Sequence, residues 1–314
     1  MRNPIRTLTG AGLLVLSSTL LAQSMDLGKE LRLAAAAGDS ERMATLLDQG
    51  ADVNGANPSG QTALMVAAEK GDIPTAALLL ARGADVNART QSGLTALTFA
   101  AENGNIGMTA LLIERGAHLH DRTREGWDPL MIASRYGIRD MAEQLLFRGA
   151  DPKASDRHGR TALMQAAEQG HANLVELLVA AGADLEARDR AGATALIIAA
   201  DLGHADVAEA LLAQGADPNS RDNQGATALI WAVGKGYGTL AQLLLERGAD
   251  PNAQDKDGTS ALMEAVSSDH NELIGSLISH QADPALRDGE GHTAVDLARS
   301  RGNQEAIALL GAGN

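Results

Sequence analysis

Hydrophobic and polar positions along this chain repeat with a period of 33 residues. The clearest copy spans Gly159 to Arg190, and shifting it by one period in either direction lands on a recognisable copy of itself. One glycine fixes the register, recurring without insertion or deletion at Gly60, Gly93, Gly126, Gly159, Gly192, Gly225, Gly258 and Gly291. A repeat of this regularity predicts a stacked architecture in which every copy is one structural unit.

Each copy predicts two short helices followed by a polar loop. Residues 161–169 are rich in helix formers, and Gly170 ends that run. A second run ends at Gly182, the place of a left-handed C-terminal cap, and its apolar residues at helical spacing are Leu174, Leu177 and Leu178. The Asp-rich segment 182–192 predicts a hairpin-like loop. Two helices of about ten residues cannot bury their apolar faces alone, so we expect an all-α solenoid of about nine helix-turn-helix units.

The unit resembles the ankyrin repeat. The matching motifs are the Gly-His pairs at residues 170–171 and 203–204, and the Gly-Ala-Asp-x-Asn loops at residues 83–87 and 248–252. This resemblance covers residues 26–310 and implies a scaffold that binds a partner protein on a concave face of loop tips and first helices. The proline that opens the family's unit is alanine in most copies, and the family's histidine is replaced by Met65, Thr98, Met131, Met164, Ile197, Ile230 or Met263. We therefore expect apolar packing where the family uses a polar side chain.

The N-terminal segment has the pattern of a secretory signal peptide. Arg2 and Arg6 precede an uncharged apolar run over residues 11–22, and Ala22 and Ser24 have the spacing of a cleavage site. Since the run falls short of the roughly 20 apolar residues that span a bilayer, an uncleaved anchor is the weaker interpretation. We expect a signal peptide over residues 1–24, no membrane insertion after its cleavage, and a periplasmic protein, with release from the cell as the alternative.

The remaining chain divides into two capping units and the array between them. Residues 25–59 lack the usual start of the unit and are expected to form the N-terminal cap, residues 60–290 the array, and residues 291–314 the C-terminal cap. The last unit of the array is irregular because Asp269 and Gln281 occupy positions that carry glycine in most other copies. A side chain at positive φ is strained, so we expect this unit to be among the less stable.

Charge argues against two classes of partner. The chain has 26 basic and 40 acidic residues, a net charge of −14, and loss of Arg2 and Arg6 makes it −16. This balance disfavours nucleic acid or an anionic membrane surface as a partner.

With no cysteine in the sequence, stability cannot come from disulfides and must come from the length of the stacked core. We expect a monomer.

No catalytic constellation stands out, so we expect neither enzymatic activity nor a cofactor. His171, His204 and His270 fall at the family's Gly-His position and are expected to be structural. His118 and His120 replace the Asp and Asn of the family's loop, and beside Asp121 they could share a metal ion. The alternative is a tolerated loop substitution, and we assign no metal site.

One stretch combines aromatic and basic side chains. The candidate partner-binding residues are Arg124, Trp127, Arg135, Tyr136, Arg157, His158 and Arg160. Trp, Tyr and Arg most often dominate the binding energy of protein interfaces. Residues 124–160 carry seven basic and six acidic side chains, whereas residues 161–314 carry nine and 22. The alternative is that Trp127 caps the stack and the arginines are ordinary solvated residues.

Two other aromatic residues, Phe99 and Trp231, share a first-helix position filled mainly by aliphatic side chains, which predicts core packing for both. Because Gln165 and Glu264 share that position, we expect it to be incompletely buried. Taken together, the sequence predicts a non-enzymatic protein-binding module exported to the periplasm. The alternatives are an accessory protein that supports or protects an exported enzyme, and a secreted effector or toxin-neutralising protein that acts on another cell.

Overall fold

The computed structural model describes residues 26–311 and forms an all-α solenoid of nine helix pairs in that range. The predicted fold class is confirmed, whereas the expected signal peptide lies outside the described residues. The first helices of the pairs are α2 (Leu27–Ala37), α4 (Ala63–Lys70), α6 (Ala96–Glu102), α8 (Pro129–Arg135), α10 (Ala162–Gln169), α12 (Ala195–Leu202), α14 (Ala228–Gly234), α16 (Ala261–Ser267) and α18 (Ala294–Arg301). The second helices are α3 (Ser40–Asp48), α5 (Ile73–Ala81), α7 (Ile106–Glu114), α9 (Arg139–Phe147), η1 (Ala172–Leu174) continuing into α11 (Val175–Ala180), α13 (Ala205–Ala213), α15 (Gly238–Glu246), α17 (Asn271–Ser279) and α19 (Gln304–Gly311).

The boundaries of each pair follow from its caps. In the fifth unit the Thr161 side chain accepts a hydrogen bond from the backbone N–H of Met164 at 3.3 Å, which satisfies a free donor at the start of α10. Gly170 ends α10 in the left-handed conformation with φ 80°. Loop residues Ser155 and Thr161 form an isolated antiparallel bridge, so the connection between units is hairpin-like as predicted.

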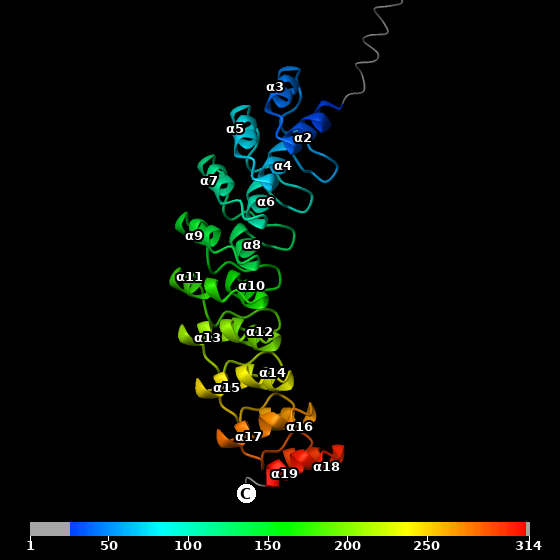
Figure 1. Cartoon of the computed structure of the whole chain (residues 1–314), viewed down its shortest axis with the longest axis vertical. Coiled ribbons are helices and arrows are strands. Elements are labelled where there is room, and N and C mark those ends of the chain that lie inside the picture. Colours follow the sequence, from blue (N-terminus) through cyan, green and yellow to red (C-terminus); the bar gives the residue numbers. More distant parts are fainter. Residues whose placement is uncertain (1–25, 312–314) are drawn as a thin grey trace, which may run out of the picture.

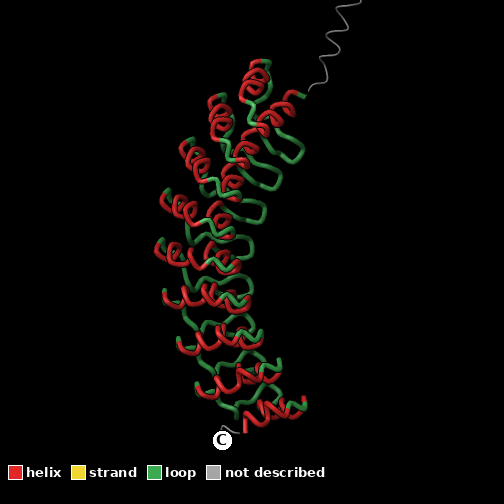
Figure 2. The backbone as a smooth tube through the Cα atoms, in the orientation of Figure 1, coloured by secondary structure: helices red, strands yellow, loops and turns green. Residues whose placement is uncertain are grey.

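The stack bows, with the first helices and the loops on the inner side of the curve and the second helices on the outer side (Figures 1 and 2). Leu174 and Leu178 are fully buried between neighbouring units. Six of the seven side chains that replace the family's histidine are apolar and buried, which confirms the apolar packing: Met65, Met131, Met164, Ile197, Ile230 and Met263. The seventh, Thr98, is also buried but exchanges hydrogen bonds with the backbone of Thr95. Burial of this kind drives the stacking of units that have no core of their own.

The buried side chains form two clusters. One cluster holds buried residues between Leu31 and Ala117, and the other holds buried residues between Ala101 and Leu310. Ile113 and Leu119, both half-buried, pack against both clusters. The core is therefore continuous within the first three units and again from the fourth unit on, with a junction between them.

Histidines at the predicted structural positions link three of the units to the ones before them. The Nε2 atoms of His171, His204 and His270 lie 3.0, 3.1 and 3.2 Å from the backbone oxygens of the residues that end the preceding first helices or lie just before their ends. These contacts confirm the structural assignment.

Adjacent loops are also linked by arginines. The guanidinium groups of Arg89, Arg122, Arg188 and Arg221 each donate to a backbone carbonyl of the next loop. Ser155 occupies the same position in the loop between the fourth and fifth units. Both types of contact tie neighbouring units together, the histidines at the turns between helices and the arginines in the loops.

Asp269 and Gln281 adopt φ angles of 60° and 69°, and they are the only residues other than glycine with positive φ among residues 26–311. The predicted backbone strain in the eighth unit is therefore present. Other units place glycine at these positions, which has no Cβ to clash with the following carbonyl.

Candidate functional site

A groove runs along the inner side of the stack from the third unit to the eighth. It consists of four adjoining hollows of about 410, 430, 340 and 190 Å³. Trp127 lines the first and second, Arg160 the second and third, and Trp231 the third and fourth. Because each hollow shares side chains with the next, we treat them together as the groove, which begins near Leu94 and ends near Glu264.

Two tryptophans in the groove are held by loop carboxylates. The indole Nε1 of Trp127 donates to Oδ2 of Asp156 at 3.0 Å, and the indole Nε1 of Trp231 donates to Oδ2 of Asp222 at 2.9 Å. The Oδ1 atom of each aspartate accepts two backbone N–H groups of its own loop, at distances between 2.7 and 3.0 Å. Each carboxylate is thereby fixed by its loop, and each ring is fixed by its carboxylate, so neither half-buried indole needs to be ordered when a ligand arrives.

A cation lies against each of these rings. The Arg135 guanidinium carbon is 5.1 Å from the centre of the Trp127 ring, and the Lys235 Nζ is 5.9 Å from the centre of the Trp231 ring. Both distances are within the range of a cation–π interaction. Carboxylates hold the cations in turn, with Arg135 Nη1 3.6 Å from Glu168 and Lys235 Nζ 3.3 Å from Asp201.

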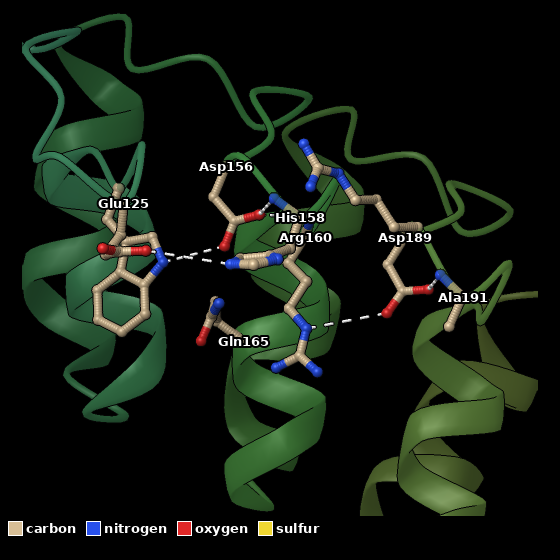
Figure 3. A pocket seen from close by; sticks show the side chains of 9 residues that line it. Glu125, Asp156, His158, Arg160, Gln165, Asp189 and Ala191 are labelled. Atoms are coloured by element: carbon tan, nitrogen blue, oxygen red, sulfur yellow. Dashed lines mark hydrogen bonds and ion pairs between the residues drawn. The ribbon is translucent and has the colours of Figure 1, made fainter.

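The middle of the groove combines a charged cluster with an apolar floor. Arg160 Nη1 lies 2.8 Å from Glu168 Oε2, and its Nε lies 3.8 Å from Asp189 Oδ2. Figure 3 shows Arg160 reaching across the second hollow toward Asp189. Small and aliphatic side chains, among them Ala191 and Ile198, line the groove beyond this cluster. The groove therefore offers apolar surface between fixed charges, as partner-binding surfaces do.

The structure gathers most of the predicted partner-binding residues at one end of the groove. Trp127, His158 and Arg160 line the second hollow, Arg124 lines the first, and Arg135 lies against the Trp127 ring. The half-buried Trp127 ring also packs against the core, as the predicted alternative of a cap on the stack requires, so the ring both covers the stack and lines two hollows.

The other two predicted residues lie beside the groove. Tyr136 follows the end of α8 with 48% of its surface exposed, and its hydroxyl donates to Glu102 at 3.1 Å. Partial burial and the Glu102 carboxylate raise the pKa of the Tyr136 phenol. Arg157 is exposed at the tip of its loop and is not part of the lining.

Asp128 follows Trp127 in the sequence and caps the N-terminus of α8. Its side chain accepts the backbone N–H of Met131 at 2.9 Å, as an N-terminal cap does. The residue is only 4% exposed, and this burial raises the pKa of its carboxyl despite the hydrogen bond.

Two expectations about the shared first-helix position were wrong in part. Trp231 packs against the core as expected, but it is only half-buried and also lines two hollows of the groove. Gln165 was expected to be incompletely buried, yet it is 1% exposed, and its amide oxygen accepts a hydrogen bond from Arg135 at 3.3 Å. The polar residues Gln165 and Glu264 indicated that this first-helix position borders the groove. The same indication held for Trp231, which occupies the same position. The loop aspartates that anchor the indoles recur at the 33-residue period, which was a further signal.

The possible metal site does not assemble in the described part of the chain. His118 Nδ1 lies 3.6 Å from Asp121 Oδ2, and its Nε2 lies 3.4 Å from the Asn87 amide nitrogen. Among residues 26–311 no three His, Cys, Asp or Glu side chains are grouped closely enough to hold an ion. The pair His118 and His120 therefore has no third ligand there.

Comparison with known families matches nearly the whole stack. A model described as ankyrin repeats (3 copies) matches residues 78–156, 130–222, 163–255 and 229–313, and one described as ankyrin repeats (many copies) matches residues 46–100. The chain belongs to the ankyrin repeat family. A search of curated proteins finds no match to this ankyrin chain.

Ankyrin repeats are generally non-catalytic modules for protein–protein interaction. The groove is therefore a candidate surface for a protein partner. None of the helices in residues 26–311 is long and apolar enough to cross a bilayer. The groove lies on the inner side of the ankyrin stack, the surface that the resemblance indicated.

Proposed function

We propose that this ankyrin chain is a non-enzymatic module that holds a partner protein in the groove between Trp127 and Trp231. The observation that carries the proposal is the fixed geometry of the two indoles, each bound to a loop carboxylate and each facing a cation. Aromatic side chains at such positions dominate many interfaces, and rigid ones lose little conformational entropy on binding.

The test is site-specific cross-linking inside cells. A photoreactive amino acid at Ala191, which is exposed and lines the groove, should form a covalent adduct with the partner on irradiation. The same amino acid at Gln242, which is exposed on α15 on the outer side, is the matched control and should not give that adduct.

Adding Trp127→Ala and Trp231→Ala should abolish the Ala191 adduct while the stack stays folded, as checked by circular dichroism. Adducts that are identical at Ala191 and Gln242, or that survive loss of both indoles, would contradict binding in the groove. Mass spectrometry of the adduct names the partner. An enzyme whose activity falls without the ankyrin chain would favour the accessory role over a simple binding module.

We also propose that the chain acts in the periplasm after export through residues 1–24, with release from the cell as the alternative. The support is the sequence alone: two arginines, a short apolar run and small residues before Met25. N-terminal sequencing of the protein recovered from periplasmic, cytoplasmic and culture fractions tests this location. An intact Met1 in the cytoplasmic fraction would contradict it.

A further inference from the structure

Three arginines form a row along the edge of the groove. Arg124, Arg157 and Arg190 occupy the same position in three consecutive loops, and all three are exposed. The backbone N–H of each donates to the preceding loop, with N–O distances of 2.7, 3.1 and 2.8 Å. The three loop tips are therefore stacked in register. We call Arg124, Arg157 and Arg190 the arginine row.

No carboxylate in the described part of the chain forms an ion pair with the arginine row. The arginines inside the groove differ, since Arg135 and Arg160 are both paired with Glu168. The molecule carries a net charge of −14, so three neighbouring cations without an internal counterion are a local exception. Charges arranged in this way select and orient a ligand of opposite sign.

The lining of the groove limits what kind of anion fits. Asp189, Asp201 and Asp222 line the hollow between Trp127 and Trp231. A nucleic acid, with a negative charge on every phosphate, would place charges against these carboxylates as well as along the arginine row. A peptide can carry negative side chains along one edge and apolar side chains along the other, which matches the two sides of the groove.

The stacking of the units sets the spacing of the negative side chains. Packed helices lie about 8–10 Å apart, so consecutive tips of the arginine row are separated by about that distance. An extended chain in the polyproline II conformation rises about 3.1 Å per residue and has three residues per turn. Three residues therefore span one unit, and every third side chain faces the same side.

We propose that the segment held in the groove is an extended acidic stretch of the partner protein. It carries Asp or Glu at every third residue to meet Arg124, Arg157 and Arg190, and apolar residues between them to cover Ala191 and Ile198. This inference rests on the proposed function and specifies the chemistry of the partner.

The probes are three synthetic ligands of twelve units, titrated against the mature chain to 1 mM. The first peptide has Asp at positions 2, 5 and 8 with leucine and alanine between them, and the second has the same composition with the three Asp residues adjacent. The third ligand is single-stranded oligothymidylate. Binding is followed by tryptophan fluorescence, which reports on the groove because the two tryptophans of the chain both line it.

We expect the spaced peptide to bind about tenfold more tightly than the clustered one, and oligothymidylate to bind more weakly than either. Replacing Arg124, Arg157 and Arg190 together by serine should remove the preference for the spaced peptide. Arg115→Ser takes one charge from an exposed site at the end of α7, on the outer side, and should leave all affinities within about twofold.

Equal affinity for the two peptides, tighter binding of oligothymidylate, or no fluorescence change up to 1 mM would each overturn the inference. The cross-link from Ala191 separates this failure from that of the proposed function. If the partner is still cross-linked at Ala191 after the arginine row is replaced by serine, a protein occupies the groove, but the inference that its bound segment is acidic is wrong. If the Ala191 adduct is absent from the unmodified chain as well, the proposed function fails too.

Discussion

Replacing Gln281 by glycine should stabilise the eighth unit. Gln281 has φ 69° in the loop that follows α17, where the preceding unit has Gly248 with φ 90°. Its side chain is exposed and makes no hydrogen bond within the described residues, so the substitution changes the backbone preference and little else. Asp269 is a less suitable target because its carboxylate lies 3.3 Å from both Arg301 and Asn303.

The expected gain follows from two opposing contributions. The left-handed conformation costs an ordinary L-residue roughly 1–2 kcal/mol, and glycine avoids this cost. Glycine also loses more conformational freedom on folding, which offsets roughly 0.5–1 kcal/mol. The net stabilisation should therefore be about 0.5–1 kcal/mol for local opening of this unit.

Native-state hydrogen exchange resolves this effect because it reports stability unit by unit. In Gln281→Gly, the amides of α16 and α17 should exchange about two- to fivefold more slowly. The reciprocal change Gly248→Gln is the matched control. Its new Cβ would meet no atom within 4 Å, so it adds only backbone strain and should speed exchange in α14 and α15.

Unchanged or faster exchange of α17 in Gln281→Gly would refute this reasoning, provided that Gly248→Gln behaves as expected. If neither substitution changes exchange, the left-handed residues contribute no measurable strain, and the expectation of a less stable eighth unit loses its basis.

Urea unfolding followed by circular dichroism tests three further substitutions. Ser134→Ala should raise the free energy of unfolding by about 1 kcal/mol, because the buried Ser134 hydroxyl has no hydrogen-bond partner and Ala167 fills the same position one unit on; a loss of stability would contradict this. Asp128→Thr should stabilise the chain at pH 7 and lose its advantage as the pH falls. The raised pKa of Asp128 means that the native state favours the protonated acid, so the contribution of Asp128 to stability declines as the pH rises above about 4. A stability difference between Asp128→Thr and the unmodified chain that does not change with pH would contradict this. Leu178→Ala should lower stability by about 2–5 kcal/mol, since the leucine is fully buried between units, and an unchanged midpoint would exclude that packing.

The sequence was sufficient for the architecture because the repeat makes each residue's environment recur. Gly170 and the leucines of the fifth unit predicted one helix pair, and the period extended that prediction to the others. The strain at Asp269 and Gln281 was predictable for the same reason, since other copies showed which positions require glycine.

The groove was only partly predictable, because it depends on contacts between side chains of different units. Trp127 and Trp231 occupy different positions of the repeat, yet both donate to an aspartate at the same loop position. The 33-residue period alone cannot show that the Trp127 indole reaches the Asp156 carboxylate 29 residues further along the chain. The position of Gln165 was misjudged for a similar reason, since Arg135 of the preceding unit supplies its hydrogen bond.

The junction between the two core clusters has a mechanical consequence. In a stack whose units touch only their neighbours, a pulling force passes through every interface in series, and the weakest interface yields first. A load on the N-terminus would meet the junction near Ile113 and Leu119 before it reaches the fourth unit. Loss of this junction would separate the first three units, and with them Ser92 and Leu94 of the first hollow, from the part of the groove between Trp127 and Trp231. Tension on the N-terminus would therefore open the groove at that end while the two tryptophans keep their positions.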